Sequence, residues 1–367
     1  MFSRLTYPPR VVGRSARRLY ATVEAPVIVA KPPLPPLEPP PKPSRNLIDS
    51  FLLTQLANTP SSSRTSLPQL IQQYLDNSSH VLEPHLPYEP QPSPHRRISF
   101  DSADTPVHLI AHVVQEGGRS KITLSSGFAI QGSGDLKGRN VVVSCAHTLE
   151  EIRWSPLLVL PNWSSSSPNL SLPDLPHARS SGSFLVSQGP NTARNPTDTS
   201  ALVAHPITAI LSSLHRSDLV TLASPVQSQP IRTLPVSPYP ALPGTRVRAH
   251  FVSETRPHGE ESASWKPWPG GWSKWVSGRV LGYRDFAGRE AQPGTYDSLS
   301  HMLFEPLPTP GSSGGPIVDE DTGAVVGVVL GTRMDNRIEG TRGWGVPSEA
   351  IFEMFSLPGI NVSDRGK

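Results

Sequence analysis

Short apolar runs separated by turn residues fill the chain after Arg97. They are β-branched or alternate apolar with polar positions, as VHLIAHVV does over residues 107–114, and Gly, Ser and Pro separate one run from the next. Many short strands at this spacing predict antiparallel barrels or a sandwich. The expected strands are Val107–Val114, Lys121–Leu124, Gly127–Gln131, Asn140–Ser144, Gly182–Val186, Ala201–His205, Asp218–Leu222, Thr245–Val252, Trp275–Leu281, Met302–Phe304, Pro316–Val318 and Ala324–Leu330.

Helical periodicity is confined to three segments. Asn46–Ala57 (NLIDSFLLTQLA) and Ser66–Leu75 (SLPQLIQQYL) place apolar residues on one face and predict two short amphipathic helices. Pro347–Phe355 (PSEAIFEMF) predicts one helix near the end. The N-terminal pair either packs on the main domain or mediates self-association, and the pattern leaves both open.

Two segments are expected to be long loops inserted between strands: residues 154–200, which are rich in Ser, Pro and Asn, and residues 254–271. An aromatic cluster accompanies the second loop. It indicates either a surface for a substrate or partner, or packing onto the barrel wall. Its members are Trp265, Trp268, Trp272 and Trp275.

Composition sharpens this picture. Proline supplies 43 of the 367 residues, more than twice the usual share of roughly 5%, and it disfavours helix-rich folds because it is excluded from helix interiors. Eight of the twelve residues from Pro32 to Pro43 are proline, which predicts a stiff polyproline II spacer.

The single cysteine, Cys145, excludes an intrachain disulfide and favours a reducing compartment.

The first 20 residues are typical of a mitochondrial presequence, with a disordered basic tail as the alternative. They contain five arginines, no acidic residue and no continuous apolar core, and the string RLYA at 18–21 resembles an arginine-containing cleavage site. The matrix is favoured over the intermembrane space, and no stable membrane insertion is expected, because no apolar run approaches the roughly 18 residues that span a bilayer. Without those five arginines, 28 basic residues remain against 30 acidic ones, so no nucleic-acid partner is expected.

The candidate chemistry begins with the string PGSSGGPIV, which contains Ser313 between glycines and enters an apolar strand. A serine on a tight glycine turn can point its hydroxyl outward, and the same turn leaves backbone N–H groups free to bind a developing oxyanion. A serine nucleophile also requires a histidine base and a carboxylate elsewhere in the chain.

His147 is the candidate base, because VVVSCAH places it behind small residues at the end of a β-branched strand. His108, His112 and His250 lie within strand patterns and are expected to be packing positions. Asp218 is the candidate carboxylate: it precedes the apolar run LVTL, where it can accept the imidazole Nδ1–H and fix the tautomer.

The order of these three residues resembles that of the chymotrypsin/trypsin-like serine proteases. Within them, the sequence motifs are most similar to those of the HtrA-type branch. The motifs are SCAHTL, SDLVTL and PGSSGGPIVD, with further similarity in SSGFAI, VSGRV, VVGVV and GWGVP, so that the resemblance covers roughly residues 100–357. It implies an all-β fold of two antiparallel six-stranded β-barrels, with a short C-terminal helix and a Pro-rich N-terminal extension. The implied organisation is a presequence at 1–20, a Pro-rich linker with two short helices at 21–97, a first barrel with His147 and Asp218 at 98–235, and a second barrel with Ser313 at 236–358.

The resemblance also implies a serine endopeptidase that acts on polypeptides without a metal or cofactor. Ser313 would be the nucleophile, His147 the general base and then acid, and Asp218 the residue that orients His147. The N–H groups of Gly311 and Ser313 would form the oxyanion hole.

The same resemblance places the substrate as an added strand along four residues, Val329, Leu330, Gly331 and Thr332. Leu307 stands six residues before the nucleophile, where the family sets primary specificity. No acid is found there, so cleavage after Lys or Arg is not expected, and a small or apolar P1 residue is expected instead.

Ser312 departs from the pattern of zymogen-type relatives, which carry an aspartate there, so activation by a new N-terminus is not expected. Only about ten residues follow the terminal helix, so a PDZ domain is not expected.

Two alternatives to a serine endopeptidase remain: a catalytically silent protease fold that binds peptides or assembles with partners, and other acyl-transfer chemistry such as esterase activity. The α/β-hydrolase fold is disfavoured, because it needs alternating helices and the order Ser, Asp, His.

Overall fold

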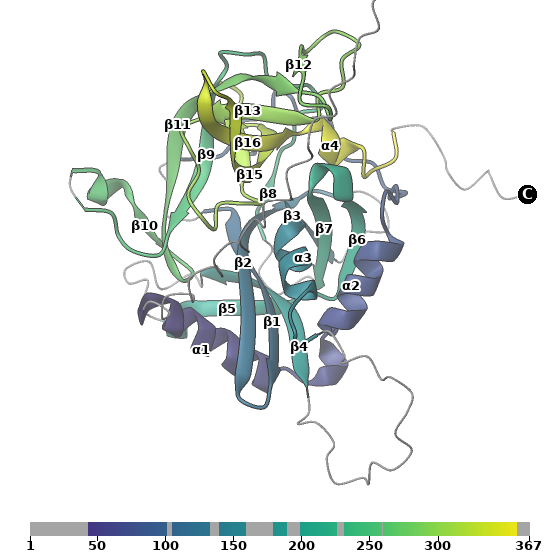
Figure 1. Cartoon of the computed structure of the whole chain (residues 1–367), viewed down its shortest axis with the longest axis vertical. Coiled ribbons are helices and arrows are strands. Elements are labelled where there is room, and N and C mark those ends of the chain that lie inside the picture. The colour runs from purple at the N-terminus through teal and green to yellow at the C-terminus, as the bar shows by residue number, and fades with distance from the viewer. Residues whose placement is uncertain are drawn as a thin grey trace, which may run out of the picture. The chain divides into compact units, whose positions relative to one another are not determined.

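Two sheets of mainly antiparallel strands form the body of the protein (Figure 1). The structure is a computed structural model, and it describes residues 43–100, 105–132, 139–158, 179–188, 199–225, 231–258 and 260–357. The predicted presequence, nearly all of the proline-rich spacer and most of the predicted loop at 154–200 lie outside these residues.

The first sheet has the strand order β5-β4-β1-β2-β3-β7-β6, and β8 pairs in parallel with β2. Its two edges meet where the chain passes from β5 to β6: Ile207 N–H donates to Ser183 O on β4, and Thr208 N–H donates to Ala223 O on β7, each over 2.8 Å. β5 and β6 are therefore one bent segment that closes a six-stranded barrel. The strands are β1 (Val107–Glu116), β2 (Arg119–Ile130), β3 (Arg139–Cys145), β4 (Ser180–Gln188), β5 (Leu202–Pro206), β6 (Ala209–Leu214), β7 (Leu219–Pro225) and β8 (Thr233–Leu234).

The second sheet is a closed ring of six strands in the order β9-β11-β13-β16-β15-β14, with β14 pairing back to β9. Two short strands, β10 and β12, add to β11. The predicted fold class, two antiparallel barrels of the chymotrypsin type, is thereby confirmed. The strands are β9 (Arg246–Ser253), β10 (Lys266–Trp268), β11 (Gly271–Arg284), β12 (Glu290–Ala291), β13 (His301–Glu305), β14 (Pro316–Asp319), β15 (Val325–Asn336) and β16 (Gly340–Pro347).

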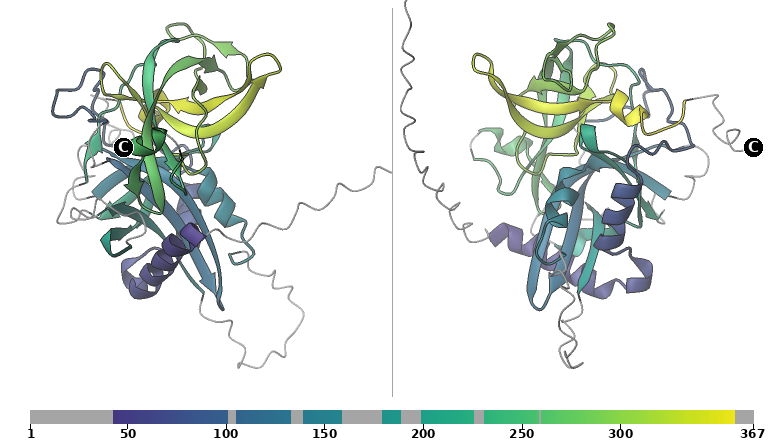
Figure 2. Two further views of the ribbon diagram at one scale, coloured as in Figure 1. Left: turned by 90° about the vertical axis from the view of Figure 1, so that its left-hand side faces the viewer. Right: turned by 45° about the vertical axis from the view of Figure 1, so that its right-hand side comes forward.

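Two N-terminal helices, α1 (Pro43–Asn58) and α2 (Leu67–Asp76), pack on the first barrel (Figure 2). Ile48, Leu52 and Leu56 of α1 join an apolar cluster with residues of β1 and β4, and α2 contributes Leu70 to a second cluster inside the same barrel. Of the two roles left open by the sequence, packing on the main domain is the one observed. The described residues form one unit, to which both helices belong.

The segment after α2 lies across the junction of the two barrels. Leu82 and Leu86 are buried in a cluster that joins Val143 of the first barrel to Val328 of the second. Leu82 also exchanges backbone hydrogen bonds with the C-terminal segment, donating to Met354 O and accepting from the N–H of residue 356, over 2.9 and 2.8 Å. The N-terminal segment therefore contacts both barrels where they meet.

The tryptophan cluster divides between core and surface. Trp265 and Trp268 are buried, and Trp268 Nε1 donates to Val107 O on β1 over 3.3 Å. Trp272 and Trp275 are partly buried and pack against the apolar clusters. Packing onto the barrel wall, one of the two alternatives above, therefore describes the buried pair. Among the described residues no helix is long and apolar enough to cross a membrane.

Three histidines expected to be packing positions are buried on strands. Burial lowers the pKa of His108 and His112 to about 4 and that of His250 to about 3, and the neighbouring His205 adds to the effect on His108. His250 lies between Trp268 and Trp275, with ring centroids 5.8 and 5.2 Å away. All three rings are therefore neutral in the folded protein near neutral pH.

The free energy of unfolding is expected to fall by several kcal/mol between pH 7.5 and pH 5. In the unfolded chain the three histidine rings bind protons near pH 6.5, whereas in the folded protein they bind protons near pH 4 or below. The free energy of unfolding therefore falls as the pH falls through this window, by about 1.4 kcal/mol per pH unit for each ring. Glu349, whose pKa burial raises to about 7, offsets part of the loss. Urea denaturation at the two pH values measures the change in the free energy of unfolding. H250F should weaken the pH dependence and the exposed-site control H258Q should not; equal unfolding free energies at both pH values would contradict the prediction.

Candidate active site

Two consecutive tight turns present Ser313. Ser312 N–H donates to Thr309 O over 3.1 Å and Gly315 N–H donates to Ser312 O over 2.9 Å. The third residues of these turns are Gly311, with φ 88°, and Gly314, with φ 83°. A type II turn requires this left-handed φ, and glycine adopts it without strain. The glycine spacing of the motif thus follows from the backbone geometry.

The second turn also packs tightly on the first barrel. A Cβ atom on Gly314 would lie 2.1 Å from Ser126 O and 2.8 Å from Cys145 N. Ser126 N–H donates to Ser313 O over 2.8 Å. Ser313 is therefore held against β2 and beside the end of β3, where His147 follows.

His147 and Asp218 are brought together by the pairing of β3 with β7. The register sets Cys145 opposite Leu219, so that the residues just beyond this pair lie at one end of the barrel. His147 Nδ1 lies 2.6 Å from Asp218 Oδ2. Ala146 N–H donates to Asp218 Oδ1 over 3.1 Å and fixes the second carboxylate oxygen.

Asp218 has a left-handed backbone, with φ 53° and ψ 35°. It ends a short 3₁₀ turn and turns the chain into β7, and aspartate is one of the few residues with a side chain that tolerate this conformation. Unfavourable backbone geometry of this kind gathers at functional sites. The identity of the residue therefore matters both for the turn and for the contact with His147.

The Ser313 hydroxyl and the histidine ring bind different partners. Ser313 Oγ donates to Leu330 O over 2.8 Å, whereas His147 Nε2 faces Cys145 Sγ at 3.6 Å. Of the three predicted catalytic residues, the structure joins His147 to Asp218 directly and places Ser313 on the neighbouring turn. Catalytic hydrogen bonds of substrate-free enzymes are often long and tighten only when substrate binds.

The predicted oxyanion-hole residues lie on the same turns. Among the hydrogen bonds of the described residues, none uses the N–H of Gly311 or of Ser313 as a donor. Both groups are therefore available to an external oxygen atom.

The predicted substrate-binding residues differ in their surroundings. Val329 is fully buried, and its backbone is already used: Val329 N–H donates to Gly315 O, and Gly314 N–H donates to Val329 O. Gly331 and Thr332 pair with β16 on one edge only, so in the described structure their other edge is open to an added strand. Leu307 is about half exposed at 48% and precedes the nucleophile turn.

Ser312, where relatives of the zymogen type carry aspartate, is fully buried. Its hydroxyl accepts a hydrogen bond from Val252 N–H over 3.0 Å and lies 2.9 Å from Thr309 Oγ1. These contacts tie the nucleophile turn to β9 of the second barrel.

The charge of Asp218 acts on His147. Burial lowers the pKa of His147, but the hydrogen bond to the Asp218 carboxylate and the contact with Cys145 outweigh it, so that the pKa lies above the ordinary value of 6.5. A carboxylate favours the charged imidazolium, which is the state of a base that has accepted a proton.

If His147 is the base of a hydrolytic reaction, kcat/KM is expected to rise with pH along a limb whose midpoint lies above 6.5. The sign follows because only the neutral ring accepts a proton, and a raised pKa moves the neutral form to higher pH. A pH profile of peptide hydrolysis measures the midpoint. C145A should retain activity and shift the limb to lower pH, because the thiol contributes to the raised pKa. A wild-type midpoint below 6.5 would contradict this prediction.

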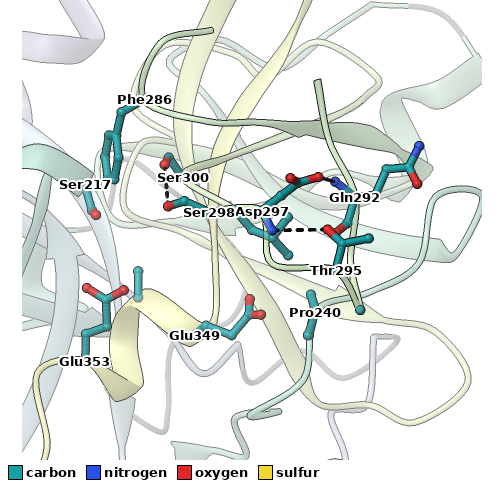
Figure 3. A pocket seen from close by; sticks show the side chains of 13 residues that line it. Ser217, Pro240, Phe286, Gln292, Thr295, Asp297, Ser298, Ser300, Glu349 and Glu353 are labelled. Carbon is teal, nitrogen blue, oxygen red and sulfur yellow. Dashed lines mark hydrogen bonds between the residues drawn. The ribbon is translucent and has the colours of Figure 1, made fainter. Parts of the chain in front are cut away.

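A cavity of about 340 Å³ is lined by residues of both barrels and of the C-terminal segment (Figure 3). It is lined by Ser217, by Phe286 and Asp297 of the second barrel, and by Glu349 and Glu353 near the helix α4 (Glu349–Phe352). None of the predicted site residues lines it. Within the described residues, no group of three or more His, Cys, Asp or Glu side chains is arranged to hold a metal ion.

Comparison with known proteins adds a family match. Residues 125–328 match the family model described as a trypsin-like peptidase domain. Among solved structures, the apo MamO protease domain from Magnetospirillum magneticum is 13% identical, with 71% of this chain and 100% of that chain covered and a TM-score of 0.38. The active form of the Rv3671c protease from M. tuberculosis is 19% identical, with 72% and 86% covered and a TM-score of 0.35. No curated protein matches the sequence.

Proposed function

The chain belongs to the family of trypsin-like peptidase domains, and on that premise we propose that it is a serine endopeptidase that hydrolyses polypeptides through an acyl-enzyme intermediate. The observation that carries the proposal is the 2.6 Å contact between His147 Nδ1 and Asp218 Oδ2, at the barrel end where the Ser313 turn packs. Two unused N–H groups on that turn complete the set of parts that acyl transfer needs.

In the proposed mechanism, Ser313 Oγ leaves Leu330 O, transfers its proton to His147 Nε2 and attacks the scissile carbonyl carbon. The carbonyl oxygen becomes an oxyanion that accepts hydrogen bonds from the N–H groups of Gly311 and Ser313. Asp218 stabilises the imidazolium, which then protonates the leaving amine. Water, activated in turn by His147, releases the acyl group from Ser313.

The proposed substrate is an extended polypeptide that pairs with the open edge of β15 at Gly331 and Thr332. Main-chain hydrogen bonds along this edge would give affinity without strong sequence preference. Leu307 is apolar and carries no charge to bind Lys or Arg, so a small or apolar P1 side chain is the proposed preference.

One observation favours a second function, a catalytically silent peptide-binding protein. Ser313 Oγ bonds to Leu330 O and His147 Nε2 contacts Cys145, so the two groups that must exchange a proton point to different partners. A protein fixed in this arrangement would bind a peptide on β15 without cleaving it.

Hydrolysis of fluorogenic peptides that differ only at P1 tests the proposal. The folded protein should cleave peptides with Ala, Val or Leu at P1 faster than those with Lys or Arg. Saturable binding of the same peptides without cleavage would contradict the endopeptidase proposal and support the silent alternative.

We also propose a role in protein processing or quality control in the mitochondrial matrix, supported by the arginine-rich, acid-free residues 1–20. Import of a fluorescent fusion tests it. Deletion of residues 1–20 should leave the fusion in the cytosol, and unchanged import would contradict the proposal.

A further inference from the structure

A cluster of buried hydroxyl groups joins the histidine end of the first barrel to the nucleophile turn. Its members come from β2, from β3 and from α3 (His147–Arg153), and each is 5% exposed or less. They are Thr123, Ser125, Ser126, Ser144 and Thr148. A buried hydroxyl is retained at low cost only where it is hydrogen-bonded, so the partners of each member show what it holds in place.

Ser126 is the member that reaches the second barrel. Its hydroxyl donates to Gly311 O over 2.8 Å, and its N–H donates to Ser313 O over 2.8 Å. One residue of β2 thus binds the carbonyl groups of both residues whose N–H groups form the proposed oxyanion hole.

The contact to Gly311 matters because glycine has no side chain to restrict its backbone. The peptide between Gly311 and Ser312 is held at both ends: Ser126 binds its oxygen, and its N–H donates to Thr309 O over 3.1 Å. This peptide is fixed on one side of the Gly311 Cα atom, and the direction of the Gly311 N–H then depends on the φ of Gly311, which is 88°.

Ser126 is in turn fixed by its neighbours. Ser144 Oγ donates to Ser126 O over 2.7 Å and lies 3.3 Å from Ser125 Oγ, to which Thr148 Oγ1 donates over 3.3 Å. Thr148 directly follows His147. The hydroxyl cluster therefore links the histidine and the oxyanion-hole turn without a disulfide, in a chain with one cysteine.

We propose that Ser126 is a positioning residue that holds the Gly311 N–H in the oxyanion hole through its hydrogen bond to Gly311 O. The inference rests on the proposed function, since the role of the Gly311 N–H as an oxyanion-hole donor is assigned through the proposed acyl transfer. It assigns to the first barrel a part of the catalytic geometry that the Ser313 motif does not contain.

The test is the kinetics of S126A against the matched control S224A. Ser224 is also buried in the first barrel and donates to a backbone carbonyl, Pro206 O, but on β7 and away from the turn. S126A is expected to lower kcat about 10- to 100-fold, somewhat less than the loss of an oxyanion-hole donor itself, with KM changed less than about threefold. S224A should change neither.

A peptide boronic acid provides the second measurement, because its tetrahedral adduct with the nucleophile places an oxygen in the oxyanion hole. Its inhibition constant should rise in S126A in proportion to the loss of kcat, whereas binding of the substrate peptide to S313A and to S313A/S126A should be equal. S144A, which removes the support behind Ser126, should show a smaller loss in the same direction.

The outcomes separate this inference from the proposed function. An active wild type whose S126A variant retains kcat within twofold would overturn the inference alone. A loss of kcat accompanied by equally weakened peptide binding would also overturn it, since the substrate groove would then be the part disturbed. A folded wild type that neither cleaves peptides nor binds the boronic acid would overturn the proposed function itself.

Discussion

Replacement of Ser313 by alanine is expected to reduce kcat for peptide hydrolysis by about 10⁴- to 10⁶-fold, the range seen when a serine nucleophile of this type is removed. The hydroxyl makes one hydrogen bond in the described structure, to Leu330 O, so its loss should leave the fold intact. The variant should still bind substrate peptide, because the open edge of β15 is unchanged. Parallel measurement of hydrolysis, peptide binding and thermal unfolding separates these effects.

The control for this variant is S277A. Ser277 is exposed on β11, and its hydroxyl bonds to Glu320 on the second barrel's surface. It should retain full activity. Hydrolysis by S313A within tenfold of the wild type would show that another group performs the attack.

Replacement of Asp218 by asparagine is expected to lower kcat by about 10⁴-fold with little loss of stability. Asparagine tolerates the left-handed backbone at this position and can still accept the hydrogen bond from Ala146 N–H. Its amide would instead stabilise the wrong tautomer of His147 and remove the charge that favours the imidazolium. The pH profile of the residual activity should have a lower midpoint than that of the wild type, because the carboxylate raises the pKa of His147 in the wild type.

D321N is the matched control, since Asp321 is an exposed carboxylate on the second barrel paired with Arg246. It should alter neither kcat nor the pH profile. If D218N keeps more than a tenth of the wild-type activity, the carboxylate of the catalytic group has been assigned to the wrong residue.

The strands were predictable wherever β-branched residues form a run, as in β3 (RNVVVSC) and β15. β6 (AILSSL) was missed because two serines replace apolar positions; they are buried and bonded to backbone carbonyls of the N-terminal segment. The helix α3 was missed because it is only seven residues long and begins at His147 itself. The C-terminal helix α4 is shorter than predicted, at four residues.

The site was predictable in its residue types but not in its geometry. The motifs around His147 and Ser313 indicated the chemistry, whereas the contact with Asp218 depends on the register of β3 against β7, which no local pattern determines. The docking of α1 was indicated only in part: its apolar face required a cover, but its position against β1 and β4 depends on tertiary packing.

Ser126 was not predicted as a functional residue, although it belongs to the string SSGFAI that contributes to the family resemblance. Two adjacent serines at the start of a buried apolar run are a usable signal. Buried hydroxyls on a strand must find partners, and here the partners lie on the nucleophile turn of the other barrel.

Mass spectrometry after reaction with a fluorophosphonate tests the role of Ser313 most directly, because this reagent phosphonylates only an activated hydroxyl group. We predict a single adduct on the peptide that contains Ser313 in the folded wild type, and none after denaturation or in S313A. A folded wild type that acquires no adduct, or acquires it at a residue other than Ser313, would contradict the assignment of Ser313 as the nucleophile.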